Sequence, residues 1–258
     1  MLKTGLVSVT FRNLSAEEVV EVAKKAGLDG IEWGEGAHIP SGDVEAAKNI
    51  RKMTEDAGLS VFSYGSYFRP GDCNDVKAEF KPVLDVAVAL GAKTIRVWAG
   101  SKWSWYADEA YNNKVIEETK VICRMAEEFG INISYEFHGW SLTDNKFSAV
   151  DTWDRVQRED EKGKVDNIRL HWQPNFAFTS EDNVKTLQYL IAHNEIVHVF
   201  TWEPDGTKLP MADGVDDWKK FIDIMKKKGG DRYLMMEFVK DGTPEQLYED
   251  VKVLKSLL

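Results

Sequence analysis

Short segments in which apolar and polar residues alternate recur along the chain, and two of them place a carboxylate near their end. In residues 133–138 the apolar side chains are the odd-numbered ones, whereas the other face carries Glu136 and His138. In residues 234–238 the same alternation sets Glu237 opposite the larger apolar residues. A strand that is buried on both faces is normally apolar throughout. We therefore expect each of these glutamates to have a partner, a metal ion or a catalytic role.

Eight such segments predict β-strands, and a segment with helical periodicity follows each of them. The helix boundaries carry clear signals: Ser15 and Glu18 form a capping box, and Ser180 is expected to cap the sixth helix. Eight strand–helix units in 258 residues are the number and length of a (β/α)8 TIM barrel. We therefore predict the α/β class and a single TIM-barrel domain over residues 1–258. The predicted strands are 6–11, 30–33, 60–64, 94–98, 132–137, 168–173, 196–200 and 233–238.

In a TIM barrel the chemistry lies where the strands run into the loops that follow them. The last four strands each present one metal-capable side chain at this level, and these are two carboxylates, an imidazole and an amide. Such a set matches a mixed oxygen and nitrogen site for Mn²⁺, Co²⁺ or Mg²⁺. The alternative is a closed polar network in the barrel centre, and a slip of one residue in register would invert the pattern. By strand alternation, the side chains that face the barrel interior near this end are Glu32, Arg96, Glu136, Gln173, His198 and Glu237.

Three further histidines lie near the predicted site. His138 shares the face of Glu136, so it could contact substrate or simply pack beside it. His38 lies in a loop at the same end and is a weaker candidate for substrate binding. His171 lies deeper than Gln173, and we expect it to be a hydrogen-bonded core residue or a support for one of the ligands.

Most tryptophans also lie at the strand ends or in the loops just after them. Flat aromatic faces beside carboxylates and amides suit a sugar, because its C–H faces stack while its hydroxyls form hydrogen bonds. We expect Trp98 and Trp202 to contact the substrate, whereas the alternation places Trp172 in the core. No glycine-rich cradle for a phosphate follows the last two strands, which favours a non-phosphorylated substrate. The tryptophans in question are Trp33, Trp98, Trp103, Trp105, Trp140, Trp172 and Trp202.

Composition excludes several classes of partner. The formal net charge is −10 and no basic stripe is present, so the chain is a poor candidate for binding nucleic acid. No apolar run approaches the length of a membrane span, and the N-terminus lacks the pattern of a signal peptide. We therefore expect no membrane association and a cytoplasmic protein. Cys73 and Cys123 are expected to be free thiols.

With these motifs in place, the chain resembles the xylose isomerase-like TIM-barrel superfamily of sugar isomerases and epimerases, over nearly its whole length. In the ketose 3-epimerases of that superfamily, Glu, Asp, His and Glu hold a divalent metal ion. The resemblance carries three of these roles to Glu136, His198 and Glu237, whereas Gln173 stands where the family has Asp. The segments that carry the resemblance are 30–33, 95–98, 135–138, 198–200 and 236–238.

The resemblance implies proton transfer at carbon through the enediolate of a small ketose. Glu136 and Glu237 would face opposite sides of the sugar, while Arg96 and Glu32 would bind or orient hydroxyls. Two bases would give an epimerase, and a single base would give an aldose–ketose isomerase. The alternatives are a glycoside hydrolase that uses the same two glutamates and a non-catalytic sugar-binding barrel, for which Gln173 is the strongest argument. Barrels of this kind often pair, so a homo-oligomer is a further expectation.

Overall fold

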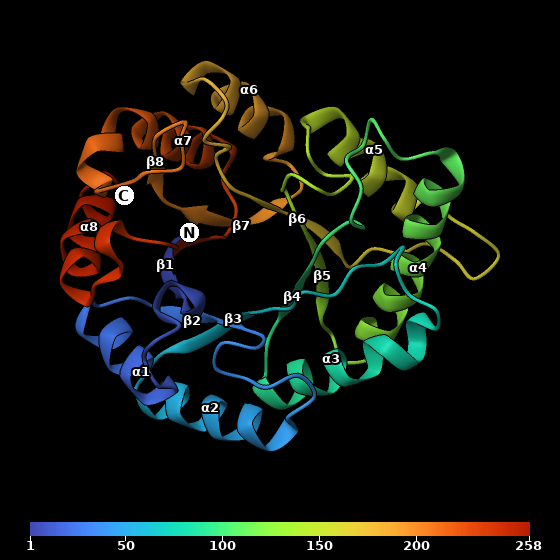
Figure 1. The fold of residues 1–258 in the computed structure, drawn as a ribbon, viewed down its shortest axis with the longest axis horizontal. Helices are drawn as coiled ribbons and strands as arrows, with labels where there is room; N and C mark the ends of the chain where they lie inside the picture. The colour runs from blue at the N-terminus through green and yellow to red at the C-terminus, as the bar shows by residue number, and fades with distance from the viewer.

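Alternating strands and helices wind once around a closed parallel barrel in the computed structural model, which describes residues 1–258 (Figure 1). Each strand pairs with its chain neighbour, and β10 returns to pair with β1, so that no edge is left open. The predicted (β/α)8 class is therefore confirmed. The barrel strands are β1 (Leu2–Val7), β2 (Gly30–Gly34), β3 (Ser60–Gly65), β4 (Thr94–Val97), β5 (Asn132–Glu136), β6 (Ile168–Trp172), β7 (Asn194–Val199) and β10 (Arg232–Met236).

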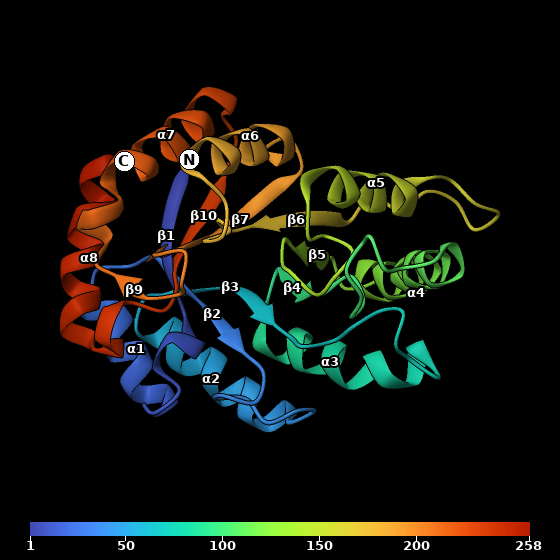
Figure 2. The same cartoon turned by 45° about the horizontal axis from the view of Figure 1, so that its top comes forward.

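The helices form an outer ring around these strands (Figures 1 and 2). Most begin at a side-chain cap, as at Ser15, where the predicted capping box with Glu18 is present. None of the helices is long and apolar enough to cross a membrane. Both cysteines are free and buried. The helices are α1 (Ala16–Lys25), α2 (Val44–Asp56), α3 (Val76–Leu90), α4 (Glu109–Glu127), α5 (Lys146–Gln157), α6 (Ser180–Leu190), α7 (Val215–Lys228) and α8 (Pro244–Leu257).

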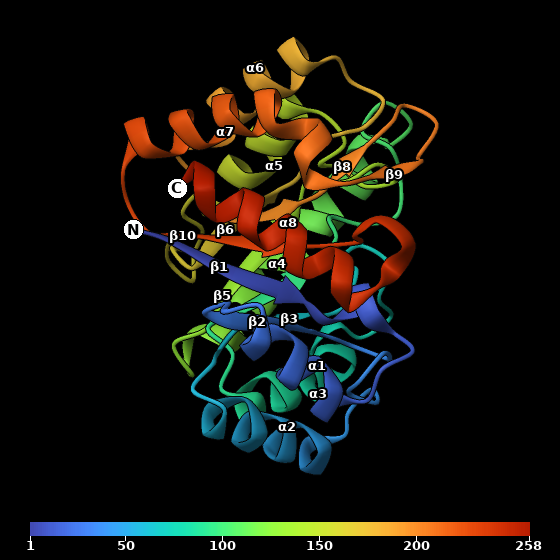
Figure 3. The same ribbon diagram turned by 90° about the vertical axis from the view of Figure 1, so that its left-hand side faces the viewer.

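Short elements occupy the loops that follow the strands. A 3₁₀ helix, η1 (Ser8–Phe11), follows β1, and a small hairpin of β8 (Thr201–Trp202) and β9 (Lys208–Leu209) follows β7. Figure 3 shows the barrel from the side, with the N-terminus at one end and this hairpin at the other. Two more 3₁₀ helices, η2 (Met211–Gly214) and η3 (Lys240–Gly242), precede α7 and α8.

Several sequence-predicted boundaries shift by one or two residues, as in the last strand, which ends at Met236 rather than at 238, and two differences have a clear local cause. The first strand covers Leu2–Val7 rather than residues 6–11, because its pairing with β10 begins at Leu2 and the chain turns into η1 after Val7. The side chain of Ser8 then accepts a hydrogen bond from the Gly34 backbone N–H at 2.9 Å, which ends the strand-like run. The sixth helix is capped by Thr179 rather than Ser180, since the Thr179 hydroxyl accepts from the backbone N–H of Asp182.

The apolar core has two parts, and their composition confirms the predicted strand alternation. The larger cluster joins the outer faces of the strands to the helices and contains Val197. The smaller cluster includes Ile196, the preceding residue of the same strand, and it closes the barrel interior beneath the polar residues. Neighbouring residues of β7 therefore face opposite sides of the barrel wall. The buried members of the inner cluster are Val7, Val9, Phe62, Ile196 and Met235.

The inner cluster depends on glycines that leave room for its large side chains. A Cβ added at Gly30 would press against the Ser60 carbonyl oxygen and lie 2.8 Å from the Phe62 ring. We predict that Gly30→Ala lowers the free energy of unfolding by about 1–3 kcal/mol, because neither the backbone nor the ring can move aside freely. Urea unfolding followed by circular dichroism checks this. Glu21→Ala, an exposed change on α1, serves as the control and should stay within about 0.5 kcal/mol of wild type. Equal stability of the two variants would contradict the prediction.

Candidate active site

A cavity of about 450 Å³ opens at the C-terminal ends of the barrel strands. This is the end at which TIM barrels carry their chemistry. Its walls combine aromatic side chains from the strand-to-helix loops with a few polar groups, as is typical of small-molecule sites. The sequence-predicted residues that line it are Arg96, Trp98, Glu136, His138, Gln173, Trp202 and Glu237.

His198 lies directly beneath the cavity floor, which Glu136, Gln173 and Glu237 line, and is the point on which these predicted ligands converge. Its Nδ1 lies 3.2 Å from Oε2 of Glu237, 3.3 Å from Oε1 of Gln173 and 3.6 Å from Oε1 of Glu136. The imidazole itself is fully buried. The amide of Gln173 is oriented by its Nε2, which donates to the Phe137 carbonyl at 3.2 Å and so turns Oε1 toward the histidine. The four side chains thus form one cluster at the barrel mouth.

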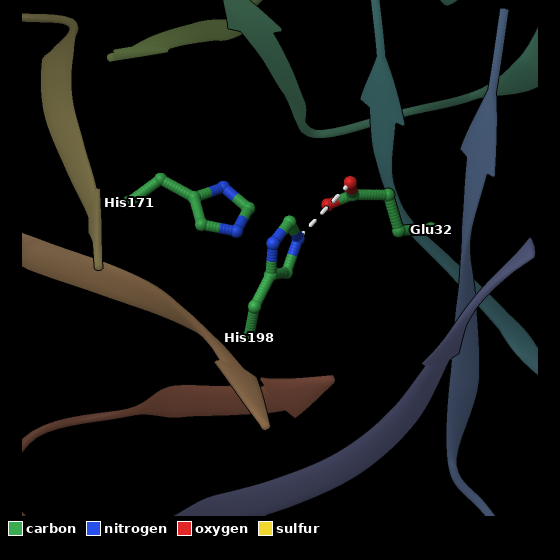
Figure 4. Close-up of side chains that lie close together, drawn as sticks. All are labelled: Glu32, His171 and His198. Atoms are coloured by element: carbon green, nitrogen blue, oxygen red, sulfur yellow. Dashed lines mark hydrogen bonds and ion pairs between the residues drawn. The ribbon is translucent and has the colours of Figure 1, made fainter. Parts of the chain in front are cut away.

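Glu32 holds the other side of the same imidazole (Figure 4). Its Oε1 lies 3.3 Å from Nε2 of His198, and its Oε2 accepts a hydrogen bond of 2.5 Å from the Ser63 hydroxyl. A carboxylate at Nε2 favours the proton on that nitrogen, which leaves Nδ1 directed at the cluster above. The expectation that Glu32 binds substrate hydroxyls needs correction. It is fully buried beneath the floor and does not line the cavity.

His171 packs against His198 from the side, with ring centroids 4.1 Å apart and an interplanar angle of 71° (Figure 4). Neither ring nitrogen has a hydrogen-bond partner, so the expectation of a hydrogen-bonded core histidine was wrong. Burial, together with the charge of His198, lowers the pKa of His171 to about 3, which keeps this ring neutral. Glu32, His171 and His198 each present a ligand atom within 4.8 Å of the others, which makes them a second possible metal-binding group.

Charge pairing fixes the ionisation of the cluster. Burial would raise the pKa of Glu136, but the charges of Arg96 and His198 outweigh it and lower the pKa to about 2. Oε2 of Glu136 accepts hydrogen bonds from the Arg96 guanidinium and from the Trp98 indole. For His198, burial would lower the pKa, yet the carboxylates of Glu237 and Glu32 raise it to about 10, so both ring nitrogens carry a proton and an ion bound at Nδ1 would take the place of that proton. Glu136 is therefore held as a carboxylate.

The donor set at the cavity floor fits a divalent metal ion. Ligands of one ion with bonds of about 2.1 Å lie about 3 Å apart when they are at right angles. The three oxygens around Nδ1 of His198 lie at 3.2–3.6 Å from it, and two of them belong to carboxylates. The group beneath is less suited, because Nε of Arg96 already lies 3.6 Å from the Glu32 carboxylate and balances its charge. Oxygen and imidazole donors together match Mn²⁺, Co²⁺ or Mg²⁺.

Aromatic side chains form two walls of the cavity. On one side Trp98 stacks on His138 with centroids 4.8 Å apart and planes 18° apart, and Trp103 packs against Trp140 nearby. On the other side Trp202 packs among phenylalanines, of which Phe238 is one. The predicted positions of Trp98, His138 and Trp202 at the mouth are thus what the structure shows, whereas their roles stay predictions.

His38 lies outside the cavity, contrary to its expected contact with substrate. Its Nε2 lies 3.2 Å from the Leu14 carbonyl, and its ring packs edge-on against Trp33 at 5.6 Å. Sequence reasoning missed Arg12 and Phe238, both of which line the cavity. Phe238 has a φ of 50°, so the alternation fails directly after Glu237 and both side chains face the same space. Nothing in the local pattern indicates such a turn.

Comparisons with known proteins agree with this architecture. The 3-dehydroshikimate dehydratase of Bacillus anthracis is 20% identical over an alignment 280 residues long, which covers 98% of this chain and 96% of that protein. The crystal structure of the probable 3-DHS dehydratase AsbF from Bacillus anthracis superposes with a TM-score of 0.81 at 18% identity, covering 99% of each chain. D-allulose 3-epimerase from Methylomonas sp. gives a TM-score of 0.73 at 16% identity, covering 100% of this chain and 98% of the other.

A sequence profile described as xylose isomerase-like TIM barrel matches residues 20–257. The match spans nearly the whole chain and includes every residue of the cluster around His198. This protein therefore belongs to the xylose isomerase-like TIM barrel family, as the sequence motifs indicated.

Proposed function

We propose that this protein is a metal-dependent enzyme that removes a proton from the carbon beside the ketone of a small polyhydroxy substrate and returns it to give an isomer or epimer. The observation that supports this most is the convergence of Glu136, Gln173 and Glu237 on Nδ1 of His198 at the floor of an aromatic-walled cavity. Similarity to the dehydratase and to ketose epimerases adds support, because both kinds of enzyme act on hydroxy ketones.

Glu136, Gln173, His198 and Glu237 would hold the ion, which when bound polarises a carbonyl and its neighbouring hydroxyl and so acidifies the C–H between them. Trp98 and Trp202 would stack on the apolar faces of the substrate. Arg96 lines the cavity as well, but its guanidinium is already paired with Glu136. We therefore assign it mainly to orienting that carboxylate, with binding of substrate hydroxyls as a second role.

The two glutamates are not equivalent as bases. One oxygen of Glu136 accepts from both Arg96 and Trp98, which reduces its affinity for a proton. Glu237 lines the cavity and contacts the His198 ring through one oxygen. We therefore assign the first proton abstraction to Glu237. The C–H electron pair enters the enediolate, and the proton rests on the Glu237 carboxylate.

The fate of that proton decides the product. If Glu237 returns it to the neighbouring carbon, the reaction is an aldose–ketose isomerisation. If a proton arrives at the original carbon from the opposite face, the centre is inverted and the reaction is an epimerisation. We assign that second face to Glu136, whose Oε1, 3.6 Å from the His198 ring, is the oxygen that Arg96 leaves available.

Dehydration is the second candidate, and the similarity to the 3-dehydroshikimate dehydratase favours it. It begins with the same proton abstraction. The electron pair then expels a hydroxyl from the next carbon, and this leaving group takes a proton from an acid to depart as water. His138 is the candidate acid, because it lines the cavity and its Nδ1 lies 2.5 Å from the Gly139 carbonyl. That contact fixes the ring and leaves Nε2 available.

A glycoside hydrolase and a non-catalytic sugar-binding barrel receive less support from the geometry. A hydrolase needs one of its two carboxyl groups protonated, whereas Arg96 holds Glu136 ionised, and both Glu136 and Glu237 turn toward the same imidazole nitrogen. A barrel that only binds sugar would not need an imidazole buried between Glu32 and the three side-chain oxygens around Nδ1.

Solvent exchange tests the proposed chemistry. In D₂O with Mn²⁺, we expect the wild-type protein to incorporate deuterium beside the ketone of at least one substrate in a panel of ketoses and cyclic hydroxy ketones, as observed by NMR. Glu237→Gln should lower the exchange rate at least roughly 100-fold, because the amide keeps an oxygen ligand but cannot accept the proton. Glu203→Gln, an exposed change on the loop after β8, is the control and should leave the rate unchanged.

Metal content is measured on each variant, because Glu237 is proposed both as a metal ligand and as the base. Exchange at the wild-type rate in a Mn²⁺-loaded Glu237→Gln protein would rule out this residue as the base. No exchange in the wild-type protein with any ketose would contradict the proposed function itself.

Gln173 offers a separate test of the ligand set. We predict that Gln173→Asp tightens Mn²⁺ binding at least roughly tenfold in a calorimetric titration, because a neutral ligand becomes an anionic one. Asn175→Asp adds the same charge to the cavity wall two residues away, where the side chain instead receives the Ala177 N–H. It should change the affinity far less. Unchanged or weaker affinity in Gln173→Asp would argue against Gln173 as a ligand.

A further inference from the structure

Four charged side chains line the cavity, and one of them has no opposite charge beside it. Arg96 is paired with Glu136, and Glu237 contacts the His198 ring. Arg12 forms no ion pair with any carboxylate of the chain, although the protein carries a formal net charge of −10. An unpaired guanidinium is therefore part of the cavity wall.

Arg12 is solvent-exposed and uses little of its hydrogen-bonding capacity. Its Nη2 donates to the Tyr67 hydroxyl at 3.0 Å, and Tyr67 also lines the cavity. A guanidinium has five N–H donors in a planar fork, so most of them remain available. This fork matches the two oxygens of a carboxylate or phosphate.

A second cation without an ion pair lies on the neighbouring β8–β9 hairpin, where it is exposed and does not itself line the cavity. Nζ of Lys208, on the β8–β9 hairpin, lies 5.1 Å from the ring centroid of Phe238, and Lys208 forms no ion pair either. The backbone N–H of Phe238 donates to the Thr10 hydroxyl at 3.1 Å, which ties this part of the wall to the η1 segment just before Arg12. The Phe238 ring thus has the Lys208 cation beside it and shares the cavity wall with Arg12.

The net charge of the site also favours an anionic ligand. The two ligand carboxylates would balance a divalent ion, and Gln173 adds no charge where the ketose 3-epimerases carry Asp. The buried pair of Glu32 and Arg96 also cancels. Arg12 therefore leaves the loaded cavity with a net positive charge, which favours an anion over a neutral sugar.

We infer that the substrate carries an anionic group that docks on Arg12, while its ketone lies over Glu237 and the His198 ring beneath it. The inference rests on the proposed function and narrows its substrate to a ketose acid or a related hydroxy-keto acid. A carboxylate is the group we expect, because the loops offer no glycine-rich cradle for a phosphate.

Calorimetric binding to the full chain, with and without Mn²⁺, tests this. D-fructuronate differs from D-fructose in carrying a carboxylate at the end of the chain, and D-fructose 6-phosphate carries a phosphate there. We expect D-fructuronate to bind roughly fivefold to tenfold more tightly than D-fructose, and the preference to shrink at high salt. Arg12→Gln should bring the ratio of the two affinities, D-fructuronate over D-fructose, close to one. Arg12→Lys should restore part of the preference.

Lys102→Gln is the matched control, since Lys102 is an exposed cation at the same end whose Nζ lies over the Tyr111 ring rather than in the cavity. It should leave the ratio unchanged. Equal binding of D-fructuronate and D-fructose, or an unchanged ratio in Arg12→Gln, would overturn the inference. Tighter binding of D-fructose 6-phosphate than of D-fructuronate would keep the anion site but make its ligand a phosphate.

Deuterium exchange separates this inference from the proposed function. Exchange of D-fructose hydrogens at a rate that Arg12→Gln does not change, with no preference for the acid, would support the proton-transfer chemistry and overturn the anion site. A preference for D-fructuronate that depends on Arg12, without any deuterium exchange, would support the anion site and contradict the proton-transfer chemistry.

Discussion

One imidazole, held from both sides, organises the interior of this barrel. His198 has Glu32 on its Nε2 side and three oxygen donors around Nδ1, and Arg96 contacts both Glu32 and Glu136. These four residues form a closed ring of alternating charge inside the barrel. Burying any one of them alone would cost several kcal/mol, so each depends on the others. The side chains that must be buried together for stability therefore include those that the predicted chemistry needs.

The apolar layer beneath and the glycines around it keep that ring in place. Phe62, Ile196 and Met235 close the barrel under the polar layer. Gly65 passes close to the ion pair, where an added Cβ would lie 2.8 Å from Nη2 of Arg96 and 3.0 Å from Oε1 of Glu32. The glycine is required there because the guanidinium and the carboxylate already fill the space that a side chain would take.

Strand alternation predicted which side chains face the barrel interior, for a physical reason. In a parallel barrel both faces of each strand are buried, so an inward-facing Glu136 or His198 breaks an apolar pattern that is otherwise continuous. Alternation does not indicate how deep in the barrel an inward-facing side chain lies. It therefore assigned Glu32 to substrate binding, whereas Glu32 lies beneath the His198 ring. It also fails where the backbone leaves the strand conformation, as at Phe238, or where a residue comes from a loop, as Arg12 does.

The unequal surroundings of Glu136 and Glu237 connect the fold to the choice of reaction. Arg96 and Trp98 occupy one oxygen of Glu136, whereas Glu237 lies after the last strand with its neighbour Phe238 turned into the same cavity. Proton abstraction beside a ketone is common to epimerases, isomerases and dehydratases. What distinguishes them is which group protonates the enediolate, or its leaving group, and from which face. Under the proposed function, that difference would depend on the two glutamates and on the wall residues beside them, Arg96 against Glu136 and His138 against Trp98.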